Sequence, residues 1–244
     1  KCALRRALPP QPIHTVPLSA VVRDYGYEYE GQHVPLLTFT AFVQRVGQDH
    51  RVQVFFLDVK IPADLPDLVP PLFQRAVQTL QHYRALDKAV FLTPYEPIFH
   101  RLRHEAQRWH QQTRTPVAIA YDTEGPQLFQ LRAWPSAVHR NQQAGARFAL
   151  WGAPVVTLQS WTDFVAAELR RRDAVNATRP RRARLRFIVW TINDTSDLCT
   201  LVGAGVDGIM TDDPARLHGI VQHWGQPGSC PAPDSTPTGL ARGG

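Results

Sequence analysis

The chain has 244 residues, of which 43% are hydrophobic and 20% charged, so it can bury a sizeable core and is not globally disordered. It has no apolar run near the length of about 20 residues that a membrane-spanning helix needs, so a soluble protein is expected. The net charge of +6 comes almost wholly from arginine, because Lys1, Lys60 and Lys88 are the only lysines.

The cysteines give no clear sign of a compartment. Cys2, Cys199 and Cys230 are odd in number and far apart, so the sequence predicts neither a disulfide framework nor a zinc site. No signal-peptide pattern is present, and the localisation stays undefined.

Residues 1–50 contain no convincing buried strand and are interpreted as a connecting segment with a helix. Residues 9–12 are a proline-rich loop and residues 25–33 a polar, aromatic loop. The spacing of apolar residues predicts a helix over 35–46, with Thr38 as its cap.

From residue 51 onward, short apolar runs alternate with amphipathic segments. Strands are expected at 52–59, 89–93, 116–121, 154–158, 187–190 and 206–211. Helices are expected at 70–86, 97–111, 136–144, 161–172, 197–202 and 215–224. This alternation predicts a parallel sheet covered by helices, either doubly wound or closed as a barrel. Residues 226–244 are expected to be a disordered tail.

The stretch 186–214 reads RFIVWTINDTSDLCTLVGAGVDGIMTDDP. Polar residues follow both of its strands, where α/β folds place their chemistry. VWTIN, followed about a dozen residues later by GVDGIMTDDP, resembles the C-terminal signature of the glycerophosphodiester phosphodiesterase family; the related sphingomyelinase D toxins share much of the pattern.

The resemblance implies an α/β fold of the TIM (β/α)8-barrel type. Such a barrel needs eight strands, and the six expected here correspond to strands three to eight. The prediction is therefore an incomplete barrel whose first two strands would precede Lys1. Residues 51–225 would be its C-terminal part, joined to the missing strands through residues 1–50.

Two charged residues end the first expected strand. Alternation along the strand puts Phe56, Asp58 and Lys60 on one side, which would face the inside of a barrel. Asp58 could ligate a divalent cation and Lys60 could contact a phosphate, and an ordinary salt bridge explains the pair equally well. The family usually has Glu-x-Lys here, whereas the toxin-like relatives have Asp-x-Lys.

The resemblance also implies substrate-binding roles near the last two strands. Trp190 would line the substrate pocket, and Asn193 would offer hydrogen bonds to the substrate. A core tryptophan followed by a capping asparagine is the alternative. Thr211 and Asp212 would either trim the pocket or cap the next helix.

The function implied is metal-assisted hydrolysis of glycerophosphodiesters to glycerol 3-phosphate and an alcohol in lipid metabolism, with Ca²⁺ or Mg²⁺ as cofactor. The family's acid and base are histidines in a His-Arg and a His-Asp pair on the first two strands, and a Glu-x-Asp pair there supplies metal ligands. The chain has no His-Asp pair, and His139-Arg140 comes too late in the sequence. The 244-residue chain alone is therefore expected to be inactive.

Two rival functions stay open: a sphingomyelinase D-like phospholipase acting on a lysolipid phosphodiester, and a non-catalytic barrel that serves as a binding module. A metal site at His100 and His104, spaced i, i+4, is not favoured, because that helix should lie outside the barrel. Residues 170–186 contain eight arginines and one acid. Without interleaved aromatic residues they indicate a solvated basic face rather than a nucleic-acid site, with weak contact to an anionic membrane surface left open.

Overall fold

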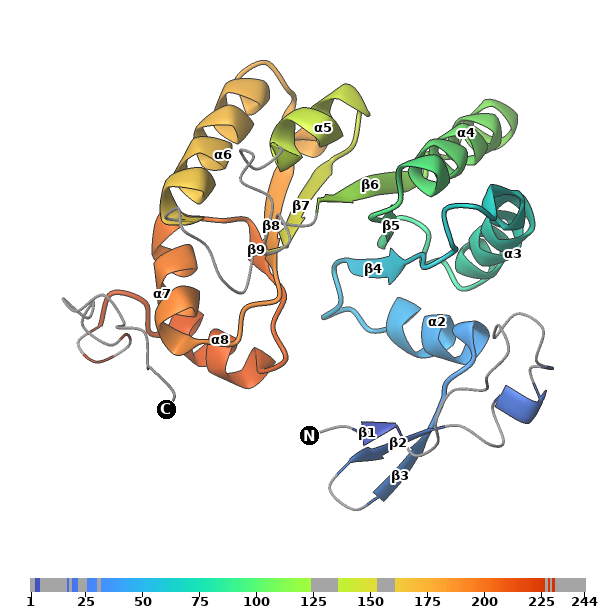
Figure 1. Ribbon diagram of the computed structural model, residues 1–244, viewed down its shortest axis with the longest axis horizontal. Helices are drawn as coiled ribbons and strands as arrows, with labels where there is room; N and C mark the ends of the chain where they lie inside the picture. The colour runs from blue at the N-terminus through green and yellow to red at the C-terminus, as the bar shows by residue number, and fades with distance from the viewer. Residues whose placement is uncertain are drawn as a thin grey trace, which may run out of the picture. The chain divides into compact units, whose positions relative to one another are not determined.

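The computed structural model describes residues 3–4, 17, 19–21, 26–29, 32–123, 136–152, 161–226, 228 and 230 (Figure 1). The chain forms two compact units, Lys1–Phe55 with Pro70–Ala89, and Phe56–Val69 with Val90–Gly244. No helix in the described ranges is both long and apolar enough to cross a membrane.

The first unit contains a small antiparallel sheet in the order β1-β2-β3. Its strands are β1 (Ala3–Leu4), β2 (Gly26–Tyr29) and β3 (Gln32–Pro35). The prediction of a polar loop over 25–33 is therefore wrong, because β2 and β3 pair as a hairpin, with Tyr29 opposite Gln32. Tyrosines recur at every second position from 25 to 29, which is the period of a strand rather than of a loop.

The helix predicted over 35–46 is present as α2 (Phe39–Gly47), but it starts four residues later than predicted, because Pro35 ends β3. Thr38 caps it, since its Oγ1 accepts a hydrogen bond of 3.2 Å from Ala41 N. Phe42 packs edge-on against Phe55, with ring centroids 5.6 Å apart. Lys88 contacts the C-terminal end of α2, where its Nζ donates a hydrogen bond of 3.0 Å to the carbonyl of Gly47. The unit also contains most of α3 (Val69–His82), which follows the 3₁₀ turn η2 (Pro66–Leu68).

The larger sheet has six strands in the order β4-β5-β6-β7-β8-β9. They are β4 (Phe55–Asp58), β5 (Ala89–Thr93), β6 (Ala118–Thr123), β7 (Phe148–Gly152), β8 (Arg186–Trp190) and β9 (Gly208–Ile209). Helices separate them: α3, α4 (Glu96–Thr113), α5 (Ala137–Gln143), α6 (Trp161–Asn176) and α7 (Thr195–Ala204), with α8 (Pro214–Gln222) last. From β5 to β9 neighbouring strands pair in parallel, and the predicted strand–helix alternation is confirmed.

One strand lies at a different place from its prediction. The strand expected at 154–158 falls outside the described residues, and the sheet position is filled by β7 (Phe148–Gly152). All five residues of β7 are buried. Both segments are short apolar runs, and local pattern cannot say which of two neighbouring runs pairs with β6 and β8.

The sheet is curled, as a barrel wall is. The rings of Phe56 on β4 and Phe148 on β7 meet edge to face with centroids 5.5 Å apart. In a flat sheet these strands, three positions apart, would be separated by about 14 Å. Phe56 and Phe148 therefore lie on the concave side of an incomplete TIM-type barrel, and alternation puts Asp58 on that same side.

The main core of this unit lies between the convex side of the sheet and the last helices. In Figure 1, α6 and α7 lie along one side of β7 and β8. Trp151, Phe187 and Val189 point into this core, with Leu198 from α7, and all four are fully buried. Trp151 stacks against Phe164 of α6 with ring centroids 4.7 Å apart.

A disulfide joins Cys199 of α7 to Cys230. The prediction that the cysteines form no disulfide framework is therefore wrong for this pair. The two cysteines are 31 residues apart, and the local sequence carries no sign that Cys230 returns to α7. The remainder of the predicted tail, from 231 onward, lies outside the described residues.

Candidate active site

The carboxyl edge of the curled sheet carries the residues singled out from the sequence. Asp58 ends β4 and Trp190 ends β8, and Lys60 follows two residues after Asp58. In parallel barrels this edge is where catalytic side chains gather. The fold therefore brings the predicted metal ligand, phosphate contact and pocket residue to one edge of one sheet.

Asp58 and Lys60 form an ion pair, with 3.0 Å between Oδ2 and Nζ. Their side chains are 46% and 56% exposed, respectively. An exposed pair of this kind contributes at most about 1 kcal/mol, so breaking it costs little. The predicted salt bridge between Asp58 and Lys60 is therefore present. The roles of Asp58 as a metal ligand and of Lys60 as a phosphate contact remain predictions.

Trp190 is held by a buried carboxylate that sequence analysis missed. Its Nε1 donates a hydrogen bond of 2.7 Å to Oδ1 of Asp122, which is 4% exposed. Because the two residues lie on β8 and β6, the bond reaches over β7 on the concave side of the sheet. The available signal was a carboxylate near the end of an apolar strand, AIAYDT.

Gly152 of β7 leaves the space that the indole fills. A Cβ on Gly152 would lie 2.8 Å from Cζ2 of Trp190, closer than real contacts of this kind. The missing side chain on the middle strand lets Trp190 lie across it and reach Asp122. Gly152, Asp122 and Trp190 therefore act as one packed unit at the barrel mouth.

The strand that carries Asp122 is fixed from outside by α5. Asn141 is fully buried, and its amide exchanges two hydrogen bonds with the backbone of Tyr121, at 2.8 and 3.0 Å. The Tyr121 hydroxyl donates to Pro94 O at 3.0 Å. Burial raises the pKa of Tyr121 above its ordinary value, although the guanidinium of Arg140 over its ring acts in the opposite direction.

Asn193 joins the loops that follow β8 and β9. Its Oδ1 accepts from the Thr211 hydroxyl at 3.1 Å and from Asp212 N at 2.9 Å, and its Nδ2 donates to Asp212 Oδ2 at 2.8 Å. The amide that was predicted to meet substrate is used inside the protein, and a substrate contact by Asn193 remains a prediction. The helix cap is Asp213 rather than Asp212, because Asp213 Oδ1 accepts from Arg216 N.

The described residues do not complete a metal site. Nowhere in the ranges searched do three or more His, Cys, Asp or Glu side chains come together to hold an ion. His100 and His104 lie beside acids of their own helix, at 3.6 Å from Glu96 and 3.4 Å from Glu105. Asp58 is thus a candidate for one ligand of a cation and not a site by itself.

A family model and several solved structures support the resemblance. The sequence model of the glycerophosphoryl diester phosphodiesterase family matches residues 186–215, the segment that carries Trp190 and Asn193. No curated protein sequence is significantly similar to the chain.

Solved structures share the fold at low sequence identity. A glycerophosphoryl diester phosphodiesterase from Silicibacter pomeroyi is 21% identical, with a TM-score of 0.52, over 77% of this chain and 56% of its own. A glycerophosphodiester phosphodiesterase from Parabacteroides distasonis is 12% identical, with a TM-score of 0.53, over 82% of this chain and 69% of its own. An Oleispira antarctica phosphodiesterase in complex with the product sn-glycerol-3-phosphate is 16% identical, with a TM-score of 0.54, over 84% and 70%.

The chain therefore spans 56% of the length of the first of these structures and about two thirds of the other two. Its curled six-stranded sheet is an incomplete form of their barrel. The chain carries the C-terminal signature of the glycerophosphoryl diester phosphodiesterase family on part of the fold that these enzymes share.

Proposed function

We propose that the chain forms the C-terminal part of a barrel that hydrolyses glycerophosphodiesters to glycerol 3-phosphate and an alcohol, in lipid metabolism. The observation that supports this most is the position of the Asp58–Lys60 pair. It lies at the carboxyl edge of the curled sheet. The segment matched by the family model includes Trp190, which ends β8 at the same edge.

Each residue has a distinct role in this proposal. The Lys60 ammonium contacts the phosphate and offsets negative charge that grows on its oxygens as the ester bond breaks. Trp190, oriented by Asp122, forms a flat apolar wall against which the glycerol carbons pack. No acid or base is assigned to a described residue, because the chain has no His-Asp pair and its His139-Arg140 pair comes too late in the sequence for the family's position.

The cofactor in this proposal is Ca²⁺ or Mg²⁺. Asp58 would give one oxygen ligand, and the other ligands would come from carboxylates that the described residues do not supply. When bound, such an ion adds positive charge beside the phosphate. Asp58 would then exchange its ion pair with Lys60 for the cation and leave the ammonium to the phosphate.

Binding of sn-glycerol 3-phosphate to the 244-residue chain tests the proposal, with isothermal titration calorimetry as the measurement. Lys60→Gln should weaken binding by about tenfold or more, because a charge-assisted hydrogen bond to the phosphate is lost. Arg75→Gln is the matched control, since it removes an exposed cation from α3. Equal weakening in both variants, or no binding by the parent chain, would show that the proposed site is wrong.

A turnover assay addresses the catalytic groups separately. The chain alone should not hydrolyse a glycerophosphodiester, because it has no His-Asp pair and no His-Arg pair at the position that the resemblance implies. Turnover that needs a divalent cation and disappears in Asp58→Ala would overturn this expectation, and would place the acid and base among the histidines present.

A sphingomyelinase D-like phospholipase is the second candidate, favoured by the Asp58-x-Lys60 spacing. Its substrate would be a lysolipid phosphodiester with a choline headgroup. Competition separates the two candidates: lysophosphatidylcholine that displaces bound glycerol 3-phosphate would favour the phospholipase. Displacement by glycerophosphocholine alone would favour the glycerophosphodiester substrate.

A further inference from the structure

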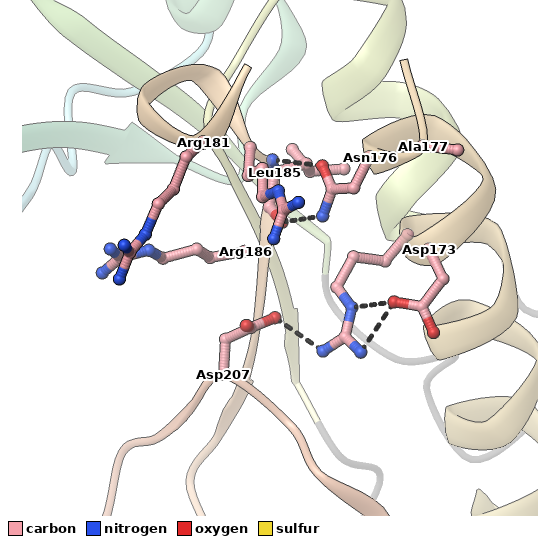
Figure 2. A pocket seen from close by; sticks show the side chains of 9 residues that line it. Asp173, Asn176, Ala177, Arg181, Leu185, Arg186 and Asp207 are labelled. Atoms are coloured by element: carbon pink, nitrogen blue, oxygen red, sulfur yellow. Dashed lines mark hydrogen bonds and ion pairs between the residues drawn. The ribbon is translucent and has the colours of Figure 1, made fainter. Parts of the chain in front are cut away.

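A pocket lies at the opposite edge of the sheet from Trp190. It has a volume of about 420 Å³ and is formed by the end of α6, the loop from α6 to β8, and the residue before β9 (Figure 2). Its charged lining consists of four arginines and two aspartates: Arg172, Arg181, Arg184, Arg186, Asp173 and Asp207.

Both aspartates pair with one of the arginines. Arg172 contacts Asp207 at 2.8 Å and Asp173 at 2.9 Å. Burial lowers the pKa of Arg172, but hydrogen bonds and charge from Asp207 and Asp173 outweigh burial and leave that pKa above its ordinary value. Arg172 therefore remains a cation with its charge satisfied inside the pocket.

The other three arginines give the pocket an excess of positive charge, because four arginines line it and only two aspartates. Within the described part of the chain, no carboxylate lies within ion-pair distance of Arg181, Arg184 or Arg186. All three are exposed. Figure 2 shows the side chains of Arg181 and Arg186 extending in the same direction, away from Asp173. Guanidinium groups gathered in one concavity favour the approach of an anion.

The floor under these arginines is held in place by hydrogen bonds. Asn176 closes the loop on itself, because its Oδ1 accepts from Leu185 N at 2.7 Å and its Nδ2 donates to Leu185 O at 2.9 Å. Asp207 Oδ2 also accepts from Phe187 N at 2.8 Å, which fixes the start of β8. A ligand would meet a preformed base and would have to order only the arginine side chains.

The pocket is separate from the candidate active site. Arg186 begins β8 and Trp190 ends it, so the strand itself holds them about 13 Å apart. Arg186 lies at the amino edge of the sheet, whereas Trp190 and Asp58 lie at the carboxyl edge. A ligand in the arginine pocket therefore cannot be the ester that reacts at the barrel mouth.

We propose that the arginine pocket binds a phosphate group, carried either by a soluble molecule or by the headgroup of an anionic lipid. Arginine forks match phosphate oxygens in pairs, so Arg181, Arg184 and Arg186 together suit a doubly charged phosphomonoester. The pocket volume lies in the range of small-molecule sites, about 300–1,000 Å³. This inference does not depend on the proposed hydrolysis.

Calorimetric titration with inorganic phosphate tests the pocket, in a Lys60→Gln background so that the barrel mouth does not contribute. Arg181→Gln with Arg186→Gln should weaken binding by at least about tenfold. The control, Arg45→Gln with Arg75→Gln, removes the same charge from exposed positions on α2 and α3 and should change binding less than about twofold. Equal weakening in the two double variants, or no binding in the Lys60→Gln background, would overturn the proposal.

A third double variant, Arg181→Lys with Arg186→Lys, keeps the positive charge and removes the paired N–H donors of the guanidinium groups. Binding weaker than that of the parent supports paired contacts to phosphate oxygens. Undiminished binding would show that the guanidinium groups do not contact the phosphate in this paired way.

Two further measurements identify the carrier of the phosphate. Co-sedimentation with phosphatidylcholine vesicles that contain phosphatidic acid, lost in the Gln double variant, indicates a lipid headgroup. In the Lys60→Gln background, binding of sn-glycerol 3-phosphate without vesicle binding, again lost on Arg181→Gln with Arg186→Gln, indicates a soluble ligand. Vesicle and phosphate binding that are both insensitive to Arg181 and Arg186 would refute the site.

Discussion

The indole Nε1 of Trp190 donates its hydrogen bond to Asp122, a residue 68 positions earlier in the chain, at 2.7 Å. The bond joins two strands that are not neighbours, because β7 lies between β6 and β8. It therefore fixes the orientation of the pocket tryptophan through the curvature of the sheet rather than through a local turn.

Trp190→Phe should lower the free energy of unfolding by about 1–3 kcal/mol more than Trp109→Phe does. Both changes remove an indole, but only the first leaves the buried carboxylate of Asp122 without this donor. Trp109 Nε1 has no hydrogen-bond partner in the described structure, so its loss costs packing alone. Urea denaturation followed by circular dichroism measures both variants, and equal losses would mean that the Asp122 bond adds no stability.

Glu168→Ala should destabilise the larger unit by about 3–5 kcal/mol. The Glu168 carboxylate is fully buried, pairs with Arg171 and accepts from Val138 N at 2.8 Å and Ser136 Oγ at 3.0 Å. Its removal leaves a buried backbone donor and a cation without their acceptor. The comparison is Glu96→Ala, which removes an exposed acid from α4 and should cost under about 1 kcal/mol. Thermal and urea denaturation measure both, and a small effect at Glu168 would contradict this account.

Removal of the disulfide by Cys199→Ser with Cys230→Ser should cost roughly 2–4 kcal/mol, because the cross-link restricts the unfolded chain over 31 residues. A reducing agent should lower the stability of the parent chain by a similar amount and leave the double variant unchanged. Cys2→Ser serves as the control and should have no such effect. Free thiol at both positions, shown by alkylation and mass spectrometry of the native protein, would contradict the bond.

Asp49 provides a prediction about pH. Hydrogen bonds from the side chain and backbone of Arg51, at 2.7 and 2.9 Å, hold the pKa of Asp49 well below its ordinary value of 3.8. A lowered carboxyl pKa contributes stability that is present above pH 3.8 and is lost as the pH falls below it. Asp49→Asn should therefore lower the melting temperature at pH 7 and have progressively less effect below pH 3.8.

Asp64→Asn is the matched change for Asp49, at an exposed aspartate for which the described structure contains no ion pair. Its melting temperature should follow that of the parent chain at every pH. A loss at Asp49→Asn that is constant with pH would show that the charge of Asp49 is not involved.

Elements with a local signal were predicted well. Strand β5 has the predicted bounds, and Thr38 caps α2 as predicted. A capping side chain bonds to a backbone amide two or three residues away, so the sequence contains both partners. Alternation along β4 likewise put Phe56 on the inner side of the sheet, where its ring meets that of Phe148.

Features that depend on distant partners were missed. The position of β7, the Cys199–Cys230 bond and the Asp122–Trp190 pair each depend on segments whose meeting is decided by the whole fold. The β2–β3 hairpin is a local pairing, and its signal, tyrosines at every second position, was present in the sequence. Asp122 shows the limit most clearly. Its position near the end of an apolar strand was visible in the sequence, but nothing local indicated that a tryptophan 68 residues later would need an acceptor.

The side-chain amide of Asn193 connects the loops after β8 and β9, since three hydrogen bonds join it to Thr211 and Asp212. A change of sequence in one loop thus alters the support of the other. Efforts to transfer substrate preference from a related barrel should therefore exchange both loops together with Asn193. A graft of one loop alone would break contacts that the other loop needs to keep its shape.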